Sequence, residues 1–557
     1  MSVRAPLFAA VALAALVAGC SVTPSPSSPA RDVLSVSVEQ TSAWTRNFNP
    51  LLVGAARWPT RGGIYEPLFI WNSAAGSWAP WLATAYRWSA DHRTLTVTTR
   101  DGVTWSDGAP FTAADVAFTF ELLHRQRALD ASGVWDFLAA VRAVDARTVE
   151  LTFARPFVPG LVELLQQTIV PAHIWRAVAD PLAFTNPHPV GTGPFTDVRV
   201  FRNQVWELGK NPRYWQPGKP QLDALRMVAY PSNDQANLAL VEGEIDWAGN
   251  FVPAIDRTFV ARDRAHHGYW YPTTGSTVFL YPNTQRAPLD DVRVRKALSL
   301  AIDRQRVVDI GLYGYARPSD GTGLSDAYAS WRDAAVAADG WVRHDARAAA
   351  ALLDDAGWRR GADGVRAKDG RRLALTLEVV SGWSDWVRAA QVIARDLGEV
   401  GVDVTLRAYE WSAWFQRLQS GQFDLAIACP SLALSFEAPT PYYVYRWISS
   451  TTSATRPPGE LLPTNWNRFG DPRTDALLGE FERTDDAARQ HALMQQVEAR
   501  FAATAPAIPL FSSPQWGVFS SRRFVGFPQA SDPYATLSPH AEPQDLLVLT
   551  NLRPRRR

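Results

Sequence analysis

The stretch from Arg372 to Ser431 alternates strand-like and helix-like segments, and this order constrains the fold more than any other feature of the sequence. The segments RLALTLEVVSG, VDVTLRAYEW and FDLAIACPS favour strands, whereas WVRAAQVIARDLGEVG and SAWFQRLQSG favour helices. A strand regularly followed by a helix is typical of an α/β arrangement. The sequence therefore predicts at least one α/β lobe in this half of the chain.

The N-terminus predicts export and a lipid anchor. The apolar run Leu7–Ala18 follows Arg4 and is shorter than the roughly 20 residues that a membrane-spanning helix needs, as in a signal peptide. Leu16–Cys20 resembles a bacterial lipobox, so we expect residues 1–20 to be removed up to Cys20 and that cysteine to be lipidated. The alternative is an ordinary signal peptide with an incidental cysteine. Residues 21–30, SVTPSPSSPA, are expected to be a flexible Pro/Ser tether.

Length and charge narrow the class of protein further. The chain beyond the tether is long enough for several cores, because single cores stop growing at about 250 to 300 residues. The formal net charge of +1 provides no field suited to nucleic acid, and the basic end NLRPRRR is interpreted as a solvated tail. Cys429 has no cysteine partner once Cys20 is lipidated, so it is expected to be a buried thiol.

A hairpin followed by a capped helix is predicted early in the chain. The segment Thr94–Trp105 alternates and turns at Asp101-Gly102, as a β-hairpin does. Thr112 is a good N-cap residue, and Asp115 three positions later completes a capping-box pattern. These residues predict a turn and a helix start, which is a structural role.

Nine segments in this order resemble the family 5 extracellular solute-binding proteins, the peptide- and nickel-binding components of bacterial ABC importers. They are NFNPLL, IYEPLF, TVTTRDGVTWSDGAPFTAADVAFTFE, GTGPF, KNPRYW, LVEGEID, DDVRVRKALSLAIDR, LLDDAGW and QFDLAI. The resemblance implies an α/β, two-lobed periplasmic-binding-protein-like fold with an extra small domain inserted in the first lobe. It also implies that a solute is enclosed between the lobes by hinge closure.

The resemblance sets the expected domain boundaries. Lobe one is expected to comprise residues 31–60, 190–285 and 510–557, with the small domain at 61–189 and lobe two at 286–509. Proline and glycine break the periodic segments at three places, where the chain is expected to cross between lobes: Pro187–Gly193, Asn283–Pro288 and Pro506–Pro509.

The motifs fit a scaffold better than an enzyme. The GTGPF segment has Thr196 where a dinucleotide fingerprint requires its third glycine, and no GxxxxGK[ST], HExxH, CxxC or GxSxG motif occurs. The adjacent pair His266-His267 would point to opposite faces of a strand, which disfavours a metal site. We expect no catalytic residues, no metal and no cofactor. A secreted hydrolase using carboxylate pairs such as Asp354-Asp355 or Asp485-Asp486 remains the alternative from another class.

These observations predict a lipid-anchored, monomeric substrate-binding protein of an ABC importer. It would lie at the outer face of the cytoplasmic membrane, capture an oligosaccharide or oligopeptide and deliver it to the permease subunits. A sensor that binds the same solutes and signals to a partner would use the same domain, and it stays open as an alternative.

The ligand is expected to be an uncharged polar solute, with a peptide as the alternative. Family peptide binders commonly hold the amino terminus with an aspartate after the strand that matches FDLAIACPS, but the segment LALSFEAPTPYYVYRW offers only Glu437. Indoles stack on sugar faces and amides meet hydroxyls, although large aromatics also fill cores. The candidate ligand-binding residues are Trp44, Asn47, Asn49, Tyr65, Trp247, Trp270, Asn283, Trp383, Trp411, Trp414, Glu437 and Trp466.

Overall fold

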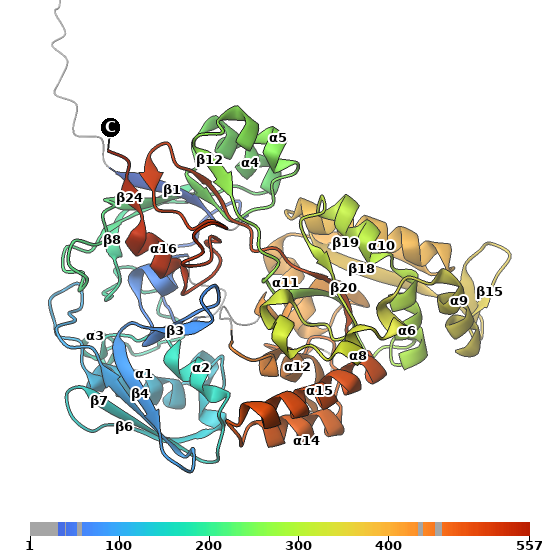
Figure 1. Cartoon of the computed structure of the whole chain (residues 1–557), viewed down its shortest axis with the longest axis horizontal. Coiled ribbons are helices and arrows are strands. Elements are labelled where there is room, and N and C mark those ends of the chain that lie inside the picture. The colour runs from blue at the N-terminus through green and yellow to red at the C-terminus, as the bar shows by residue number, and fades with distance from the viewer. Residues whose placement is uncertain (1–31, 39, 53–57, 433–437, 452–458, 557) are drawn as a thin grey trace, which may run out of the picture.

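The computed structural model describes residues 32–38, 40–52, 58–432, 438–451 and 459–556. Three sheets organise the chain into two lobes and a smaller domain (Figure 1). We call the part built on the seven-stranded sheet lobe one, the part built on the six-stranded sheet lobe two, and the part built on the four-stranded sheet the small domain. This mixed α/β, two-lobed architecture is the expected fold class.

The seven-stranded sheet draws its strands from three distant parts of the chain. In spatial order they are β12 (His267–Tyr269), β22 (Val518–Ser520), β11 (Trp247–Ala248), β1 (Val33–Ser37), β10 (Ala224–Val228), β9 (Val205–Lys210) and β8 (Phe195–Arg202). The first strand, β1, runs parallel to both its neighbours, with Val33 opposite Ala224 and Val36 opposite Trp247. The N-terminal, middle and C-terminal segments therefore share one sheet.

The six-stranded sheet contains the predicted strand–helix alternation. Its order is β14 (Arg317–Pro318), β21 (Ile508–Ser512), β13 (Thr277–Pro282), β20 (Leu425–Ala428), β18 (Ala374–Val380) and β19 (Asp403–Tyr409). Helix α10 (Ser384–Glu399) connects β18 to β19, which run parallel, and α11 (Trp411–Ser420) follows β19. The prediction of an α/β lobe from Arg372 to Ser431 is thus confirmed.

Two expected crossing points between the lobes are wrong. Strand β13 lies inside 190–285 but pairs with β20 and β21, so the chain enters lobe two before Thr277 and not at Asn283–Pro288. The chain leaves lobe two only after β21 ends at Ser512, and not at Pro506–Pro509. The reason is that all six residues of β13 are buried in the sheet interior, and Pro282 ends this strand without starting a linker. The remaining domain limits stay predictions.

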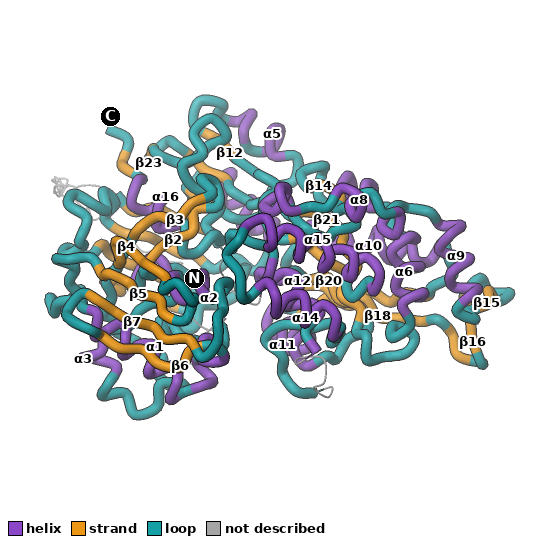
Figure 2. Tube along the Cα trace, turned by 60° about the horizontal axis from the view of Figure 1, so that its bottom comes forward, coloured by secondary structure: helices purple, strands orange, loops and turns teal. Residues whose placement is uncertain are grey.

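The small domain is a four-stranded antiparallel sheet with a helix packed on it. Its order is β4 (Ala83–Trp88), β5 (Thr94–Thr99), β7 (Thr148–Phe153) and β6 (Leu138–Ala143). Helix α1 (Ala113–Arg125) packs against β6 and β7 (Figure 2). The predicted capping box is present, because Thr112 accepts from the Ala114 amide and the Asp115 carboxylate accepts from the Thr112 amide.

The other elements connect and cover these sheets. The short strands are β2 (Phe69–Asn72), β3 (Ser77–Pro80), β15 (Arg359–Arg360), β16 (Arg366–Lys368), β17 (Arg371–Arg372), β23 (Phe524–Val525) and β24 (Arg553–Pro554). The α-helices are α2 (Gly160–Leu165), α3 (Ala172–Trp175), α4 (Asn233–Glu242), α5 (Ile255–Thr258), α6 (Val292–Ala301), α7 (Arg304–Arg306), α8 (Ala334–Ala337), α9 (Ala346–Asp355), α12 (Tyr442–Ser449), α14 (Pro472–Phe481), α15 (Ala487–Thr504) and α16 (Asp545–Asn551). The 3₁₀ and π turns are η1 (Thr60–Ile64), η2 (Arg127–Leu129), η3 (Val134–Asp136), η4 (Val260–Arg262), η5 (Val307–Gly311), η6 (Asp326–Trp331), η7 (Gly340–Val342) and η8 (Pro430–Leu432). Within the described ranges, no helix has the length and apolar character needed to cross a membrane.

The glycines of the GTGPF motif let two backbones touch. A Cβ on Gly191 would lie 2.0 Å from the carbonyl oxygen of Ile64, and one on Gly193 would lie 2.2 Å from that of Gly63. The Gly193 amide donates to the Ile64 carbonyl at 2.9 Å. The motif therefore serves close approach of the chain, and the segment that it meets is residues 63–64 of η1.

A buried carboxylate, Glu66, joins the small domain to lobe one. Its side chain has no exposed surface and accepts hydrogen bonds from Trp81 Nε1 at 2.7 Å, the Tyr214 hydroxyl at 2.9 Å and Trp215 Nε1 at 3.1 Å. Trp81 lies between β3 and β4, whereas Tyr214 and Trp215 follow β9 of lobe one. Burial raises the pKa of Glu66, and these three donors oppose the rise.

We predict that Glu66→Gln destabilises the protein by about 2 kcal/mol or more. The amide would turn N–H groups toward donors that need an acceptor, leaving buried groups unpaired. Urea denaturation would measure the change, with Glu121→Gln on the exposed face of α1 as the control. An equal free energy of unfolding for Glu66→Gln and the parent would contradict this role.

Candidate functional site

Aromatic side chains gather where the parallel strands β18 and β19 end. Trp383 follows β18 and precedes α10, and Trp411 begins α11 directly after β19; both are half-buried. Their ring centroids lie 5.3 Å apart, and Phe415 stacks on Trp411 at 5.2 Å with 10° between the planes. We call Trp383, Trp386, Trp411, Trp414 and Phe415 the tryptophan cluster. Ligands of open α/β sheets bind at this edge, outside the carboxyl ends of the strands.

The tryptophan cluster adjoins the boundary with lobe one. The Asn233 amide of lobe one donates to the Gly382 carbonyl at 3.2 Å, next to Trp383. The Asn233 side chain donates to the Asp385 carboxylate at 3.4 Å. Burial raises the pKa of Asp385 to about 6, which its hydrogen bonds and Arg388 only partly oppose. A carboxylate, an amide and indoles thus meet where the two lobes touch.

A second aromatic group lies beside this boundary. The Arg388 guanidinium of α10 lies over the ring of Phe251 at 4.9 Å and over that of Tyr313 at 5.3 Å. Phe251 belongs to lobe one and also packs edge-on against Trp516, which lies on the connecting segment, at 5.3 Å. Tyr313 lies in lobe two with Arg388, so the Arg388–Phe251 contact, worth about 0.5–2 kcal/mol, is the one of the two that joins the lobes.

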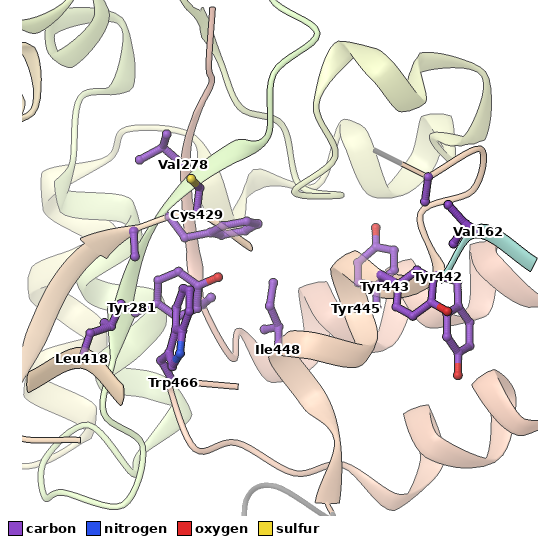
Figure 3. Close-up of a cluster of buried hydrophobic side chains, with 14 of the residues drawn as sticks. Val162, Val278, Tyr281, Leu418, Cys429, Tyr442, Tyr443, Tyr445, Ile448 and Trp466 are labelled. Carbon is purple, nitrogen blue, oxygen red and sulfur yellow. The ribbon is translucent and has the colours of Figure 1, made fainter. Parts of the chain in front are cut away.

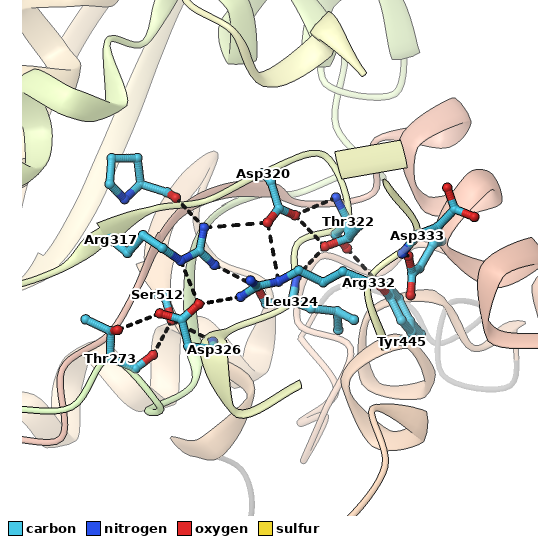
Figure 4. Close-up of polar contacts among 12 residues, drawn as sticks. Thr273, Arg317, Asp320, Thr322, Leu324, Asp326, Arg332, Asp333, Tyr445 and Ser512 are labelled. Carbon is cyan, nitrogen blue, oxygen red and sulfur yellow. Dashed lines mark hydrogen bonds and ion pairs between the residues drawn. The ribbon is translucent and has the colours of Figure 1, made fainter. Parts of the chain in front are cut away.

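An ion-pair network fixes the connecting segments to lobe two (Figure 4). Asp326 accepts from Arg317 at 2.7 Å and from Arg332 at 2.6 Å, and both arginines also lie within 3.5 Å of Asp320. Asp326 further accepts from the hydroxyl of Thr273, whose carbonyl accepts from the Ser512 hydroxyl, each at 2.5 Å. Two arginines and two carboxylates therefore balance one another where the chain enters and leaves lobe two.

The small domain also contacts lobe two, through the segment before α2. The Val158 amide donates to the Glu482 carbonyl at 2.9 Å, and the Glu482 carboxylate pairs with Arg155. The Tyr443 hydroxyl of α12 donates to the Pro159 carbonyl at 3.2 Å. Figure 3 shows Val162 of α2 beside Tyr442 and Tyr443. We call this surface the α2–α12 contact.

A buried acid, Glu163, lies inside the α2–α12 contact. Burial raises its pKa to about 8; its hydrogen bond with Tyr443 and the charge of Arg446 oppose the rise, and Asp130 and Asp136 add to it. The Tyr443 hydroxyl lies 3.2 Å from the Pro159 carbonyl, so its one proton is shared between that carbonyl and Glu163. With its pKa raised to about 8 by burial, Glu163 is mostly neutral at pH 7.

Most of the candidate ligand residues lie in the interior. Asn49 donates to the carbonyls of Pro181 and Phe184, Asn283 to those of Gly421 and Phe423, and Trp247 to that of Leu537. Trp44, Asn47, Tyr65, Trp414 and Trp466 are buried as well. Because protein groups already satisfy the asparagine amides, these amides hold loops in place in this structure. Glu437 and Cys20 lie outside the described residues.

Three candidates keep exposed surface near the lobe boundary. Trp383 and Trp411 belong to the tryptophan cluster, and half-buried Trp270 lies on the connecting segment, where its amide donates to the Gly517 carbonyl. The sequence reasoning missed Arg388, Asp385 and Phe415; of these, only Phe415 has helical spacing from a predicted residue, four positions after Trp411. Glu163 carried no comparable sequence signal.

Two further expectations concern cysteine and histidine. Cys429 is a free, buried thiol whose pKa burial raises to about 11, so it is an unreactive packing residue, as expected. His266 contacts the Asp263 carboxylate at 3.0 Å, whereas His267 stacks on Phe259 at 3.9 Å and contacts that residue's carbonyl. The two imidazoles thus have separate partners.

Two lobes joined by crossing segments, with an aromatic group at their boundary, define the class of two-lobed periplasmic binding proteins. The profile of bacterial extracellular solute-binding proteins, family 5, matches residues 77–455, which is more than half of the chain. The chain belongs to this family. The family and the structural neighbours are binding proteins of ABC transporters and not enzymes.

Several relatives and solved structures resemble the chain over most of its length. The nickel-binding periplasmic protein of Escherichia coli is 28% identical over 494 residues, covering 85% of this chain and 88% of that protein. Protein XP55 of Streptomyces lividans is 28% identical over 73% of this chain and 71% of its own. A periplasmic oligopeptide-binding protein of Thermotoga maritima superposes with a TM-score of 0.85 at 25% identity, covering 95% of this chain and all of that one.

We predict that Glu163→Gln changes how stability depends on pH. The folded-state pKa of about 8 lies above the ordinary value of 4.5, so the stabilisation that a protonated Glu163 contributes is fully present below about pH 4.5 and is lost as the pH rises to about 8. The amide of the variant does not ionise, so the variant does not lose stability in this way. Relative to the parent, the variant should gain on the order of 2–4 kcal/mol between pH 4.5 and 8.

Thermal unfolding of both proteins across this pH range measures the effect, with Glu121→Gln again as the control. Asp385 and Glu498, whose pKa values are raised to about 6 and about 7, contribute equally to both proteins and cancel in the comparison. Parallel curves for parent and Glu163→Gln would contradict a neutral Glu163.

Proposed function

We propose that this chain is a lipid-anchored substrate-binding protein of an ABC importer that captures an oligosaccharide between its two lobes. The observation that carries the proposal is the half-buried pair Trp383 and Trp411, 5.3 Å apart, at the carboxyl ends of two parallel strands and beside the boundary with lobe one. Flat indoles with partly exposed faces suit the apolar faces of sugar rings.

The groups around this pair are suited to an uncharged polar ligand. The Asn233 amide is polar, and Asp385, buried beside it, has a pKa raised to about 6. An uncharged ligand would bring no additional charge into this buried region, so no new counter-charge would be needed there. A structural neighbour from Thermotoga maritima, 24% identical with a TM-score of 0.86, was solved with mannohexaose, so this glycan belongs in any ligand panel.

An oligopeptide is the second candidate. Glutathione-binding proteins of Salmonella are among the relatives, at 26% identity over 59% of this chain. The structural neighbours include an oligopeptide-binding protein of Bacillus subtilis in complex with a nonapeptide. A peptide amine would need a carboxylate partner, and Asp385, like the exposed Glu410 before Trp411, lies next to the tryptophan cluster.

A thermal-shift assay of the purified protein can identify the class of ligand. Cello-, xylo- and manno-oligosaccharides are compared with di- to pentapeptides, because a ligand at 100 times its dissociation constant adds about 2.7 kcal/mol to stability. We expect a shift with at least one glycan series. A shift with peptides and with none of the glycans would reject the sugar proposal and direct mutagenesis to Asp385 and Glu437.

A single substitution tests whether the tryptophan cluster contacts the ligand. Trp411→Ala should weaken glycan binding about tenfold by removing one stacking face. Trp71→Ala is a matched control, because Trp71 is also a partly exposed indole in an aromatic pair but lies in β2 and packs on Trp78, not on the tryptophan cluster. Equal affinities of Trp411→Ala and Trp71→Ala, with both proteins folded, would remove the cluster from the binding site.

The lipid anchor requires its own test. If Cys20 carries the lipid, Cys20→Ala should move the protein from the membrane fraction to the soluble fraction, because the apolar run Leu7–Ala18 is too short to hold it in the bilayer. Cell fractionation and immunoblotting measure this distribution. A Cys20→Ala protein that stays in the membrane pellet would refute lipid anchoring.

A further inference from the structure

The basic C-terminus is fixed to lobe one and is not the solvated tail expected from its sequence. Strand β24 pairs with β23, with Arg553 opposite Val525. Beyond it, the Arg555 amide donates to the Arg523 carbonyl and its Nε to the Ser521 carbonyl, each at 2.7 Å. The side chains of Arg553, Arg555 and Arg556 are exposed on this fixed backbone.

These arginines form one surface with a lysine of β9. A shallow depression is lined by Lys210, Arg553, Arg555 and Arg556, and by one carboxylate, that of Asp32. We call these four basic residues the basic patch. Lys210 pairs with Asp223 at 3.0 Å, but none of the three arginines forms an ion pair with a carboxylate in the described part of the chain. The patch therefore keeps a net positive charge after Asp223 and Asp32 are taken into account.

The basic patch lies where the N-terminal segment joins lobe one. Asp32, the first described residue, lines the same depression, and Figure 1 shows β1 beside β24 near the C-terminus. Cys20 precedes Asp32 by 12 residues. A chain of that length spans at most about 40 Å and on average about 20 Å. A lipid on Cys20 would thus keep the patch close to the bilayer.

We propose that the basic patch binds the anionic headgroups of the membrane surface to which the chain is tethered. The proposal rests on the lipid anchor of the proposed function for its setting, but the surface itself can be tested without lipid. Exposed charges act within a Debye length of about 8 Å at physiological salt, so the body must touch the surface. The tether makes that encounter intramolecular and raises the effective concentration.

This contact would orient the protein. The basic patch belongs to the end of lobe one that lies farthest from α9 and β15 of lobe two in Figure 1. Seating this end on the bilayer holds lobe one and leaves lobe two without a membrane contact. Hinge motion would then move lobe two relative to a seated lobe one.

Vesicle co-sedimentation tests the proposal. The chain from residue 21 onward retains every described residue and lacks the lipid, so binding reports the protein surface alone. It should bind vesicles of phosphatidylcholine mixed with phosphatidylglycerol and not vesicles of pure phosphatidylcholine, and added NaCl should weaken the binding. Each arginine near such a surface contributes about fivefold.

The variant R553S/R555S/R556S should lose at least about tenfold in binding to the anionic vesicles. R553S/R556S spares the Arg555 hydrogen bonds and, at about fivefold per arginine, should still lose at least about tenfold, which separates charge from folding. R359S/R360S/R371S removes three exposed arginines of β15 and β17 on lobe two and should change nothing.

Three results would overturn the proposal: equal binding to both kinds of vesicle, equal losses in the patch and control variants, or displacement by inorganic phosphate beyond that by NaCl of equal ionic strength. The last result would indicate a discrete anion site. Because no solute is present, none of these results depends on whether the protein binds sugar or peptide.

Discussion

The buried carboxylate of Glu66 is the interaction on which the arrangement of the small domain and lobe one depends. Three neutral donors, the indoles of Trp81 and Trp215 and the Tyr214 hydroxyl, converge on its two oxygens from segments far apart in the chain. Burial of this acid is costly, its three donors offset part of the cost, and losing one of them would leave a buried group unsatisfied. The IYEPLF and KNPRYW segments thus meet at one point.

The backbone near Glu66 is packed as tightly as its side chain. Gly191 and Gly193 let the GTGPF segment lie directly against Gly63 and Ile64, just before Glu66. A side chain at either glycine would overlap backbone atoms, which cannot move out of the way as a flexible side chain can. Several of the segments that carry the family resemblance therefore serve this junction, and backbone atoms pack closely at the contact between the small domain and lobe one.

The sequence could predict local structure far better than long-range contacts. The capping box at Thr112 and the alternation around β18 and β19 depend on neighbouring residues, and both were predictable. The crossing at Asn283–Pro288 was not, because proline and glycine end a strand inside a sheet as readily as they begin a linker. Trp383 and Trp411 were predicted with nine other aromatic or amide residues, since residue type alone does not show which of them face outward.

The strengths of the two small-domain contacts indicate which lobe it moves with. Toward lobe two, the Glu482 carboxylate meets Arg155 of the small domain, whose side chain is 42% exposed. Such solvated pairs contribute about 0–1 kcal/mol each. Toward lobe one, Glu66 is fully buried and its loss costs more. Opening of the lobes should therefore separate the α2–α12 contact and leave the Glu66 junction intact, so the small domain travels with lobe one.

In the open state, water would reach Glu163 and lower its pKa toward the ordinary value, so that Glu163 would release its proton. Closure of the lobes is then coupled to proton uptake between about pH 4.5 and 8.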